Sequence, residues 1–251
     1  MPDVNPNALA AWRRLLAELM GTALLVTVVV GSGIAAARLS PSDSGLQLLE
    51  NSTATVFGLA VLILVFGPVS GGHFNPVISA IDWLLTRRPH SGLSAGGVAR
   101  YGAAQLVGAI LGALLANIMF DLPALQISAT DRIGVGHGLG EVVATAGLVL
   151  LVFALARTGR AALSAAAVGA YIGAAYWFTS STSFANPAVT VGRMFSDTFA
   201  GIAPTSALFF IAAQLVGGLV GVGLVRFFFP DAPVTAGRAV VPHPNHVPEE
   251  G

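Results

Sequence analysis

The sequence contains no cysteine and no lysine, and it has few charged residues of either sign. The absence of cysteine excludes disulfides, thiolate metal sites and cysteine nucleophiles. Charged residues make up 10% of the 251 positions, while apolar residues make up 55%. A soluble protein carries roughly 25% charged residues. This composition therefore argues against an ordinary soluble domain.

The few charges that are present cancel. Twelve arginines are balanced by twelve acidic residues, so the formal net charge is zero. A neutral chain gives no electrostatic reason to expect a polyanion partner, and we predict no nucleic-acid binding. The sequence also contains no catalytic constellation and no nucleotide motif. We therefore predict that the protein is not an enzyme, and that it needs no cofactor and no metal.

Long stretches without any charge locate the parts of the chain that can cross a lipid bilayer. A spanning helix needs roughly 20 mostly apolar residues. The first apolar run is too long for a cleavable signal, and Glu18 interrupts it. The pattern predicts an all-α membrane protein with six transmembrane helices, near 12–36, 50–68, 98–120, 139–156, 162–180 and 203–227.

Two of the charge-free windows, 51–81 and 161–192, are longer than one span requires. Each contains about ten extra apolar residues, too few to cross the bilayer again. Each surplus also contains an Asn-Pro pair. Asn is a favoured N-cap and Pro is favoured at the first helical position. Asn75 and Asn186 therefore predict two re-entrant loops, each returning as a half-helix, near 76–86 and 187–196.

The two halves of the chain resemble each other. "AELMGTALLV" matches "GEVVATAGLV" and aligns Glu18 with Glu141, while "AAQLVGA" matches "AAQLVGG" and aligns Gln105 with Gln214. Asn75 aligns with Asn186. Each half holds three spans, an odd number, so the second half must be inverted relative to the first. Inverted repeats with broken helices that meet at the midplane are typical of transmembrane conduits.

The two asparagines suggest what such a conduit would pass. The oxygen of an Asn side chain can cap a half-helix while its NH₂ group still donates. Each half-helix adds about +0.5 charge at its N-terminus. Two donors and two positive helix ends around a narrow pore favour neutral hydrogen-bonding solutes and disfavour cations and proton relay.

The arginines predict the orientation of the chain. Nine arginines fall on the side of the termini and three on the other side, which places both termini in the cytoplasm. We expect a multi-pass protein of the inner (plasma) membrane. Its parts are a polar leader (1–11), a channel domain (12–228, with repeats of about 12–120 and 139–228) and a tail (229–251). The tail contains five prolines and is expected to be disordered.

Over about residues 12–228 the sequence resembles the aquaporin and aquaglyceroporin (major intrinsic protein) family. The resemblance is carried by "AELMGT", "SGGHFNPV", "AAQLVG", "FANPA" and the second "AAQLVGG". It implies passive flow of water or small neutral solutes, and a homotetramer with one pore per subunit. It also implies a central pore constriction built from the two Asn-Pro motifs: Asn75, Pro76, Val77, Asn186, Pro187 and Ala188. Val77 stands where the family usually has Ala.

The same resemblance implies a selectivity filter. Spacing from Asn186 assigns Ala174, Ser183 and Val189, and the second span supplies Phe57, with Thr55 as the alternative. The family usually has Arg at the position of Val189, and Arg193, one turn further, could compensate only in part. This filter predicts a wide constriction. It resembles a bacterial branch associated with metalloid hydroxides, so the expected solutes are water, glycerol and neutral hydroxides such as arsenous acid.

Five residues are expected to support the pore loops: Glu18, Glu141, Gln105, Gln214 and His73. The symmetric placement of the carboxylates favours acceptance of hydrogen bonds from loop N–H groups over proton relay. His73 is expected either to line the cytoplasmic vestibule or to bind the loop. Two other functions stay open, a coupled secondary transporter of related design and an aquaporin-fold protein with an occluded pore.

Overall fold

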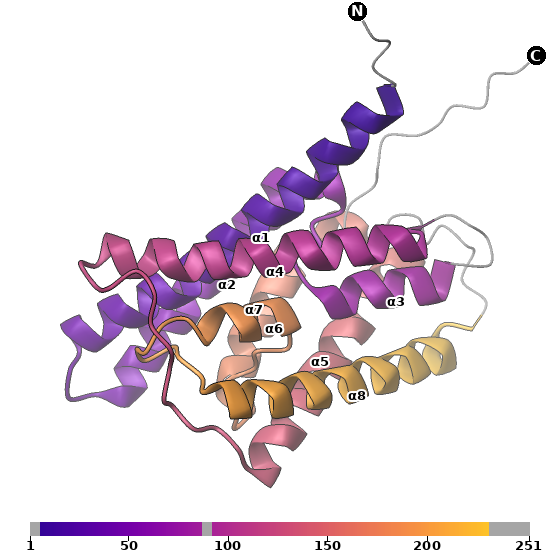
Figure 1. Cartoon of the computed structure of the whole chain (residues 1–251). Coiled ribbons are helices and arrows are strands. Elements are labelled where there is room, and N and C mark those ends of the chain that lie inside the picture. Colours follow the sequence, from indigo (N-terminus) through magenta and orange to yellow (C-terminus); the bar gives the residue numbers. More distant parts are fainter. Residues whose placement is uncertain (1–5, 87–91, 231–251) are drawn as a thin grey trace, which may run out of the picture.

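The computed structural model describes residues 6–86 and 92–230, and the leader's first five residues and the tail beyond Pro230 lie outside it. The described chain folds into helices joined by loops, with no strand among these residues (Figure 1). The α-helices are α1 (Pro6–Leu39), α2 (Ser44–Ser70), α3 (Pro76–Thr86), α4 (Ala95–Met119), α5 (Val135–Arg157), α6 (Ser164–Phe178), α7 (Pro187–Arg193) and α8 (Pro204–Phe228); a 3-10 turn (Ala161–Leu163) precedes α6.

Six of these helices are long and apolar enough to cross a membrane: α1, α2, α4, α5, α6 and α8. This confirms the prediction of an all-α membrane protein with six spans. The helices α1 and α2 begin six residues earlier than predicted. At α2 the reason is a cap, because the side chain of Asp43 accepts a hydrogen bond of 2.9 Å from the N–H of Leu46.

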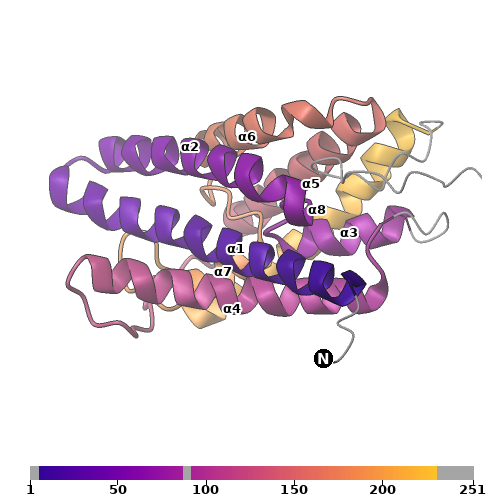
Figure 2. The same cartoon turned by 90° about the horizontal axis from the view of Figure 1, so that it is seen from above.

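The long helices pack as two similar sets. Helix α1 lies along α4, and α5 lies along α8 in the same way (Figure 2). Glycines permit both close approaches. A Cβ at Gly112 would collide with the carbonyl of Ala23 in α1, and a Cβ at Gly221 would lie 3.0 Å from the carbonyl of Ala146 in α5. Small residues at helix crossings are typical of membrane bundles.

The half-helices α3 and α7 fill the two places where the sequence predicts re-entrant loops. After α2 the chain turns at Gly71, whose φ is 92° and whose N–H donates to the carbonyl of Gly67 at 2.8 Å. The loops before the half-helices then bend in the same way, since Phe74 and Ala185 both have a φ of 48°. A left-handed backbone conformation costs free energy in residues other than glycine. It persists only where the surrounding structure holds it in place.

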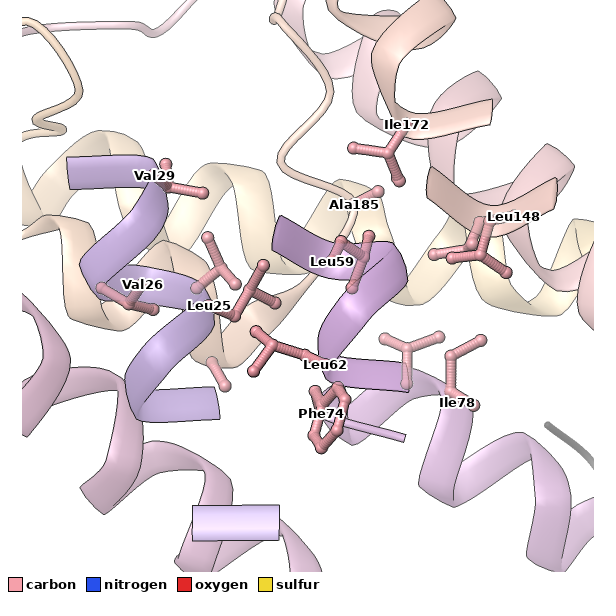
Figure 3. Close-up of a cluster of buried hydrophobic side chains, with 14 of the residues drawn as sticks. Leu25, Val26, Val29, Leu59, Leu62, Phe74, Ile78, Leu148, Ile172 and Ala185 are labelled. Carbon is pink, nitrogen blue, oxygen red and sulfur yellow. The ribbon is translucent and has the colours of Figure 1, made fainter. Parts of the chain in front are cut away.

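The apolar core surrounds these loops. Figure 3 shows side chains from both halves of the chain converging on Phe74 and Ala185. Leu25 and Leu59 come from the first half, and Leu148 and Ile172 come from the second. The half-helices are therefore held in the middle of the bundle.

Candidate functional site

The first re-entrant loop is tied to one buried carboxylate. Glu18 is fully buried, and its Oε1 accepts from the hydroxyl of Ser70 at 2.6 Å and the N–H of His73 at 3.0 Å. Its Oε2 accepts from the N–H of Phe74 at 2.8 Å and from Nε2 of Gln105 at 2.7 Å. Hydrogen bonds to a carboxylate are about twice as strong as neutral ones. Four of them fix the loop to α1, α2 and α4.

The second loop is held in the same way. Glu141, also fully buried, accepts from the N–H groups of Phe184 and Ala185, both at 2.9 Å. Nε2 of Gln214 donates to Glu141 at 2.6 Å. The sequence repeat therefore has a structural counterpart, in which Glu and Gln at matching positions bind matching loop atoms.

Two hydroxyls complete these networks, and the sequence analysis missed both. Gln105 donates to the hydroxyl of Ser79 at 3.1 Å, and Gln214 donates to the hydroxyl of Thr190 at 2.9 Å. Ser79 and Thr190 each follow their motif asparagine by four residues, and this equal spacing is the signal that would have found them. The hydroxyl of Ser79 also lies 3.1 Å from Nδ1 of His73.

The two asparagines bridge the loops reciprocally. Nδ2 of Asn75 donates to the carbonyl of Ala185 at 2.8 Å, and Nδ2 of Asn186 donates to the carbonyl of Phe74 at 2.7 Å. Their side-chain oxygens meanwhile accept from N–H groups of their own half-helices, those of Val77 and Ala188, both at 2.9 Å. Each NH₂ group has two hydrogens. One hydrogen of each amide is left for a molecule beside it.

A cavity runs past both asparagines, with about 60 Å³ open to the centre of a water molecule. A cavity needs only about 10–15 Å³ on this measure to hold one water molecule. Loop residues 72–75 and 183–186 form its polar side. Most of the remaining wall is aliphatic, with side chains from Leu25, Val29, Leu59, Ile63, Leu148, Val152, Val168 and Ile172.

The remaining motif residues do not line this cavity. Val77, Pro187 and Ala188 are buried, and Pro76 is half-buried. Val77 packs on α8, since its Cγ1 would lie 2.9 Å from a Cβ placed on Gly218. A side chain larger than Ala at position 77 therefore fits because its neighbour is glycine.

The structure corrects two of the filter assignments. Phe57 is 67% exposed and Ala174 is also exposed, and neither lines the cavity. Thr55 and Tyr176, each two residues away, line it instead. Two residues along an α-helix correspond to a rotation of about 200°, so a shift of two turns a side chain to the opposite face. The assignments of Phe57 and Ala174 are wrong, and Thr55, the alternative, lies on the cavity side.

Thr55 and Tyr176 are in contact with each other in the cavity wall, with their hydroxyl oxygens 3.2 Å apart. The hydroxyl of Thr55 also donates to the carbonyl of Asn51 at 2.8 Å. Because Thr has a single hydroxyl proton, Tyr176 must donate to Thr55. The Tyr176 oxygen is then left as an acceptor.

Ser183, Val189 and Arg193 line the same cavity. Arg193 is 3% exposed, its guanidinium carbon lies 3.4 Å from the centroid of the Phe184 ring, and its Nε donates to the carbonyl of Ala200. Side chains on a helix lean toward its N-terminus. Arg193 therefore reaches back toward the turn that contains Val189.

The loop between α4 and α5 packs against this end of the cavity. The guanidinium of Arg132 lies 5.5 Å from the Phe184 ring centroid, and its Nε donates to the carbonyl of Gly201 at 2.9 Å. Burial lowers the pKa of Arg132. The hydroxyl of Ser206 donates to Asp131 at 2.6 Å and lowers the pKa of this carboxyl. These contacts fix the loop to the segment between α7 and α8 and to the first turn of α8.

Comparison with known proteins gives consistent matches. A family model described as "Major intrinsic protein" matches residues 6–183 and 162–249. Aquaglyceroporin AqpS of Rhizobium meliloti is 46% identical over 223 residues, which cover 88% of this chain and 91% of AqpS. Aquaporin Z of Photorhabdus laumondii is 30% identical over 242 residues, covering 87% and 98% of the two chains.

A solved structure has a similar fold. The X-ray structure of the aquaglyceroporin from Plasmodium falciparum superimposes with a TM-score of 0.61. The match covers 90% of this chain and 98% of the other, at 20% sequence identity.

Proposed function

This chain belongs to the major intrinsic protein family, and from that premise we propose that it conducts water and larger uncharged solutes while excluding ions. Proteins of this family are channels and not enzymes. The cavity beside Asn75 and Asn186 is the proposed conduction path. The two Asn-Pro motifs, with Pro76, Val77, Pro187 and Ala188 packed behind the asparagines, form the proposed central constriction.

The main supporting observation is a cavity in which the loop residues form a polar strip and most of the remaining wall is aliphatic. A neutral solute can exchange its water partners for the free N–H groups of Asn75 and Asn186, while its carbon atoms contact the aliphatic wall. An ion loses far more hydration energy than such a strip can replace. Glu18 and Glu141 offer no compensation, because both carboxylates already accept hydrogen bonds from the loops.

The outer filter that we propose consists of Thr55, Tyr176, Ser183 and Val189. Thr55 and Val189 are small beside Phe and Arg, and their side chains leave room for a molecule larger than water. We propose glycerol and neutral metalloid hydroxides such as arsenous acid as solutes. The name of the relative AqpS, an aquaglyceroporin, supports the inclusion of glycerol.

Stopped-flow light scattering on proteoliposomes tests this function. Wild-type protein is expected to accelerate the flux of both water and glycerol over empty liposomes. Val189→Arg adds a fixed cation and bulk at the filter, so it is expected to reduce glycerol flux by a larger factor than water flux. A wild-type protein that passes water alone would refute the wide filter, and one that passes nothing would indicate an occluded pore.

The same liposomes separate a channel from a coupled transporter. Among the described residues no carboxylate lines the cavity, which favours passive flow. Glycerol flux is therefore expected to be unchanged by an imposed proton or sodium gradient. Accumulation of solute against its own gradient would establish coupling and overturn the proposal.

We also propose a homotetramer in the inner (plasma) membrane, with both termini in the cytoplasm. The described helices form a multi-pass membrane protein and leave large apolar side chains exposed, among them Leu64, Leu208 and Leu219. Such surfaces suit lipid or another subunit. Light scattering of the detergent-solubilised protein is expected to give a protein mass of four chains; a monomeric mass at every detergent concentration would contradict the tetramer.

A further inference from the structure

Arg193 is a buried cation whose hydrogen-bonding capacity is largely unused. Its Nε donates to the carbonyl of Ala200, but its two terminal nitrogens make no hydrogen bond to any described residue. Among the same residues no carboxylate forms an ion pair with it. The guanidinium lies on Phe184 and faces the cavity that passes Asn186. An ion buried without a partner is costly, so this arrangement favours a ligand that supplies negative charge.

Ser183 adds a second unpartnered group to the same cavity. The residue is 3% exposed, and its hydroxyl oxygen has no hydrogen-bond partner although it is fully buried. Its backbone is fixed in the left-handed region, with a φ of 51°. A buried polar atom without a partner indicates that a molecule absent from the structure completes it.

A second guanidinium lies nearby, and among the described residues no carboxylate pairs directly with either one. Arg132 approaches the same Phe184 ring, and its donors bind the carbonyls of Gly201 and Phe199. Glu141, the nearby carboxylate, already accepts from Phe184, Ala185 and Gln214. Two guanidiniums therefore act on this end of the cavity with their charge uncompensated by a direct ion pair.

We propose that the outer end of the cavity is a binding site for a small monovalent oxyanion, held by the terminal nitrogens of Arg193 and the hydroxyl of Ser183. The planar fork of a guanidinium binds two oxygens of a planar anion at once. The anion binds without passing, because the aliphatic wall further along the cavity cannot replace its hydration. While bound, it blocks neutral solutes from entering.

Nitrate is a suitable probe because it is planar, small and charged at all working pH values. Water flux through wild-type proteoliposomes is measured in nitrate and in the much larger gluconate, at equal ionic strength. Nitrate is expected to reduce the flux, by about half when its concentration equals its Kd. Arg193→Met is expected to abolish the difference between the two salts.

Arg38→Met is the matched control. Arg38 lies near the same end of the bundle, its guanidinium stacks on Phe120 at 5.3 Å, and it does not line the cavity. This variant is expected to keep the full nitrate effect. Equal wild-type flux in the two salts, or an equal nitrate effect in Arg193→Met, would overturn the proposal.

Thermal unfolding tests the anion site without measuring flux. Only the flux assay depends on the proposed channel function. Nitrate is expected to raise the Tm of detergent-solubilised wild type over its value in gluconate. Ser183→Ala is expected to diminish this shift without unfolding the protein, since the hydroxyl makes no hydrogen bond to any described residue. A wild type that conducts nothing but shows the shift refutes the channel and supports the site. An unchanged shift in Ser183→Ala and Arg193→Lys refutes the site.

Discussion

Glu18 and Glu141 are the residues whose function depends most on their partners. A carboxylate within a membrane is by default a candidate for proton transfer. Here the hydrogen bonds of the two carboxylates argue for a different role. Both oxygens of each carboxylate accept from loop N–H groups or from glutamine. This arrangement favours a structural role, because protonation of either carboxylate would remove an acceptor that the loop requires.

Glu18→Gln is expected to destabilise the protein. The amide has one acceptor in place of two, and its NH₂ group would face the donors of His73, Phe74 or Gln105. Each buried donor left unpaired costs about 1–3 kcal/mol. Thermal unfolding in detergent measures the loss, with Glu50→Gln near the start of α2 as the milder control. A variant that folds normally but loses a pH-dependent flux would instead identify Glu18 as a proton-relay group.

The proposed filter gives a second prediction at the scale of single residues. Thr55→Phe is expected to reduce glycerol flux strongly, because it places a ring in the cavity that Thr55 lines. Phe57→Ala is expected to leave the flux unchanged, because Phe57 points out of the bundle. Proteoliposome flux, measured on variants that elute as single species, checks both. Increased glycerol flux in Phe57→Ala would return Phe57 to the filter.

At the scale of elements, the sequence predicts what depends on local chemistry. The lengths of the apolar windows located six spans, and Asn-Pro predicted that α3 begins at Pro76 and α7 at Pro187. The end of α7 was predicted three residues too late, at 196. Helix α7 ends at Arg193 because the next turn is held by a tertiary contact. Nδ2 of Asn117 in α4 donates to the carbonyl of Phe195 at 2.9 Å.

The rotation of each helix was not predictable in the same way. Thr55, Leu59 and Ile63 share the cavity face of α2. Apolar residues surround a membrane helix on all sides, so the sequence pattern does not reveal which face is turned inward. The same limit applies to Tyr176 on α6, and to the stacking of Arg193 on Phe184, which joins elements through side chains alone.

Two glycines of α8 test the packing of elements. A Cβ on Gly221 would lie 2.7 Å from Cβ of Val149, whereas a Cβ on Gly223 would meet nothing within 4 Å. Within a helix, Ala has an intrinsic helix propensity more favourable than that of Gly by roughly 1 kcal/mol. Gly223→Ala is therefore expected to raise the Tm in detergent, and Gly221→Ala is expected to lower it by separating α8 from α5. Equal shifts would show that α5 and α8 are not in close contact.

At the scale of the whole molecule, the hydrogen bonds of the two buried glutamates stay within one repeat. Glu18 binds residues of the first half only, and Glu141 binds residues of the second half only. The bonds of Asn75 and Asn186, by contrast, join one half to the other. Each repeat thus shapes its own loop, and the asparagines bring the two loops into register.

The orientation of the whole chain can be tested without first removing native thiols, since the sequence has no cysteine. Thr158→Cys places one thiol at an exposed position and Gln126→Cys places one at a half-buried position, in the connections at opposite ends of α5. In intact cells an impermeant maleimide is expected to label position 126 and to leave position 158 unlabelled. Both positions should react after lysis. Labelling of 158 alone in intact cells would reverse the proposed orientation.

The reciprocal bonds of the asparagines have a consequence for biosynthesis. Asn75 is separated from its acceptor, Ala185, by 110 residues. At about 5–20 residues per second, the ribosome needs roughly 5–20 seconds to supply that acceptor. During this interval the first three spans can enter the membrane with their loop already bound to Glu18, yet half of the cavity wall is missing. A nascent or truncated chain therefore has no selective pore, and the membrane becomes permeable only when synthesis is almost complete.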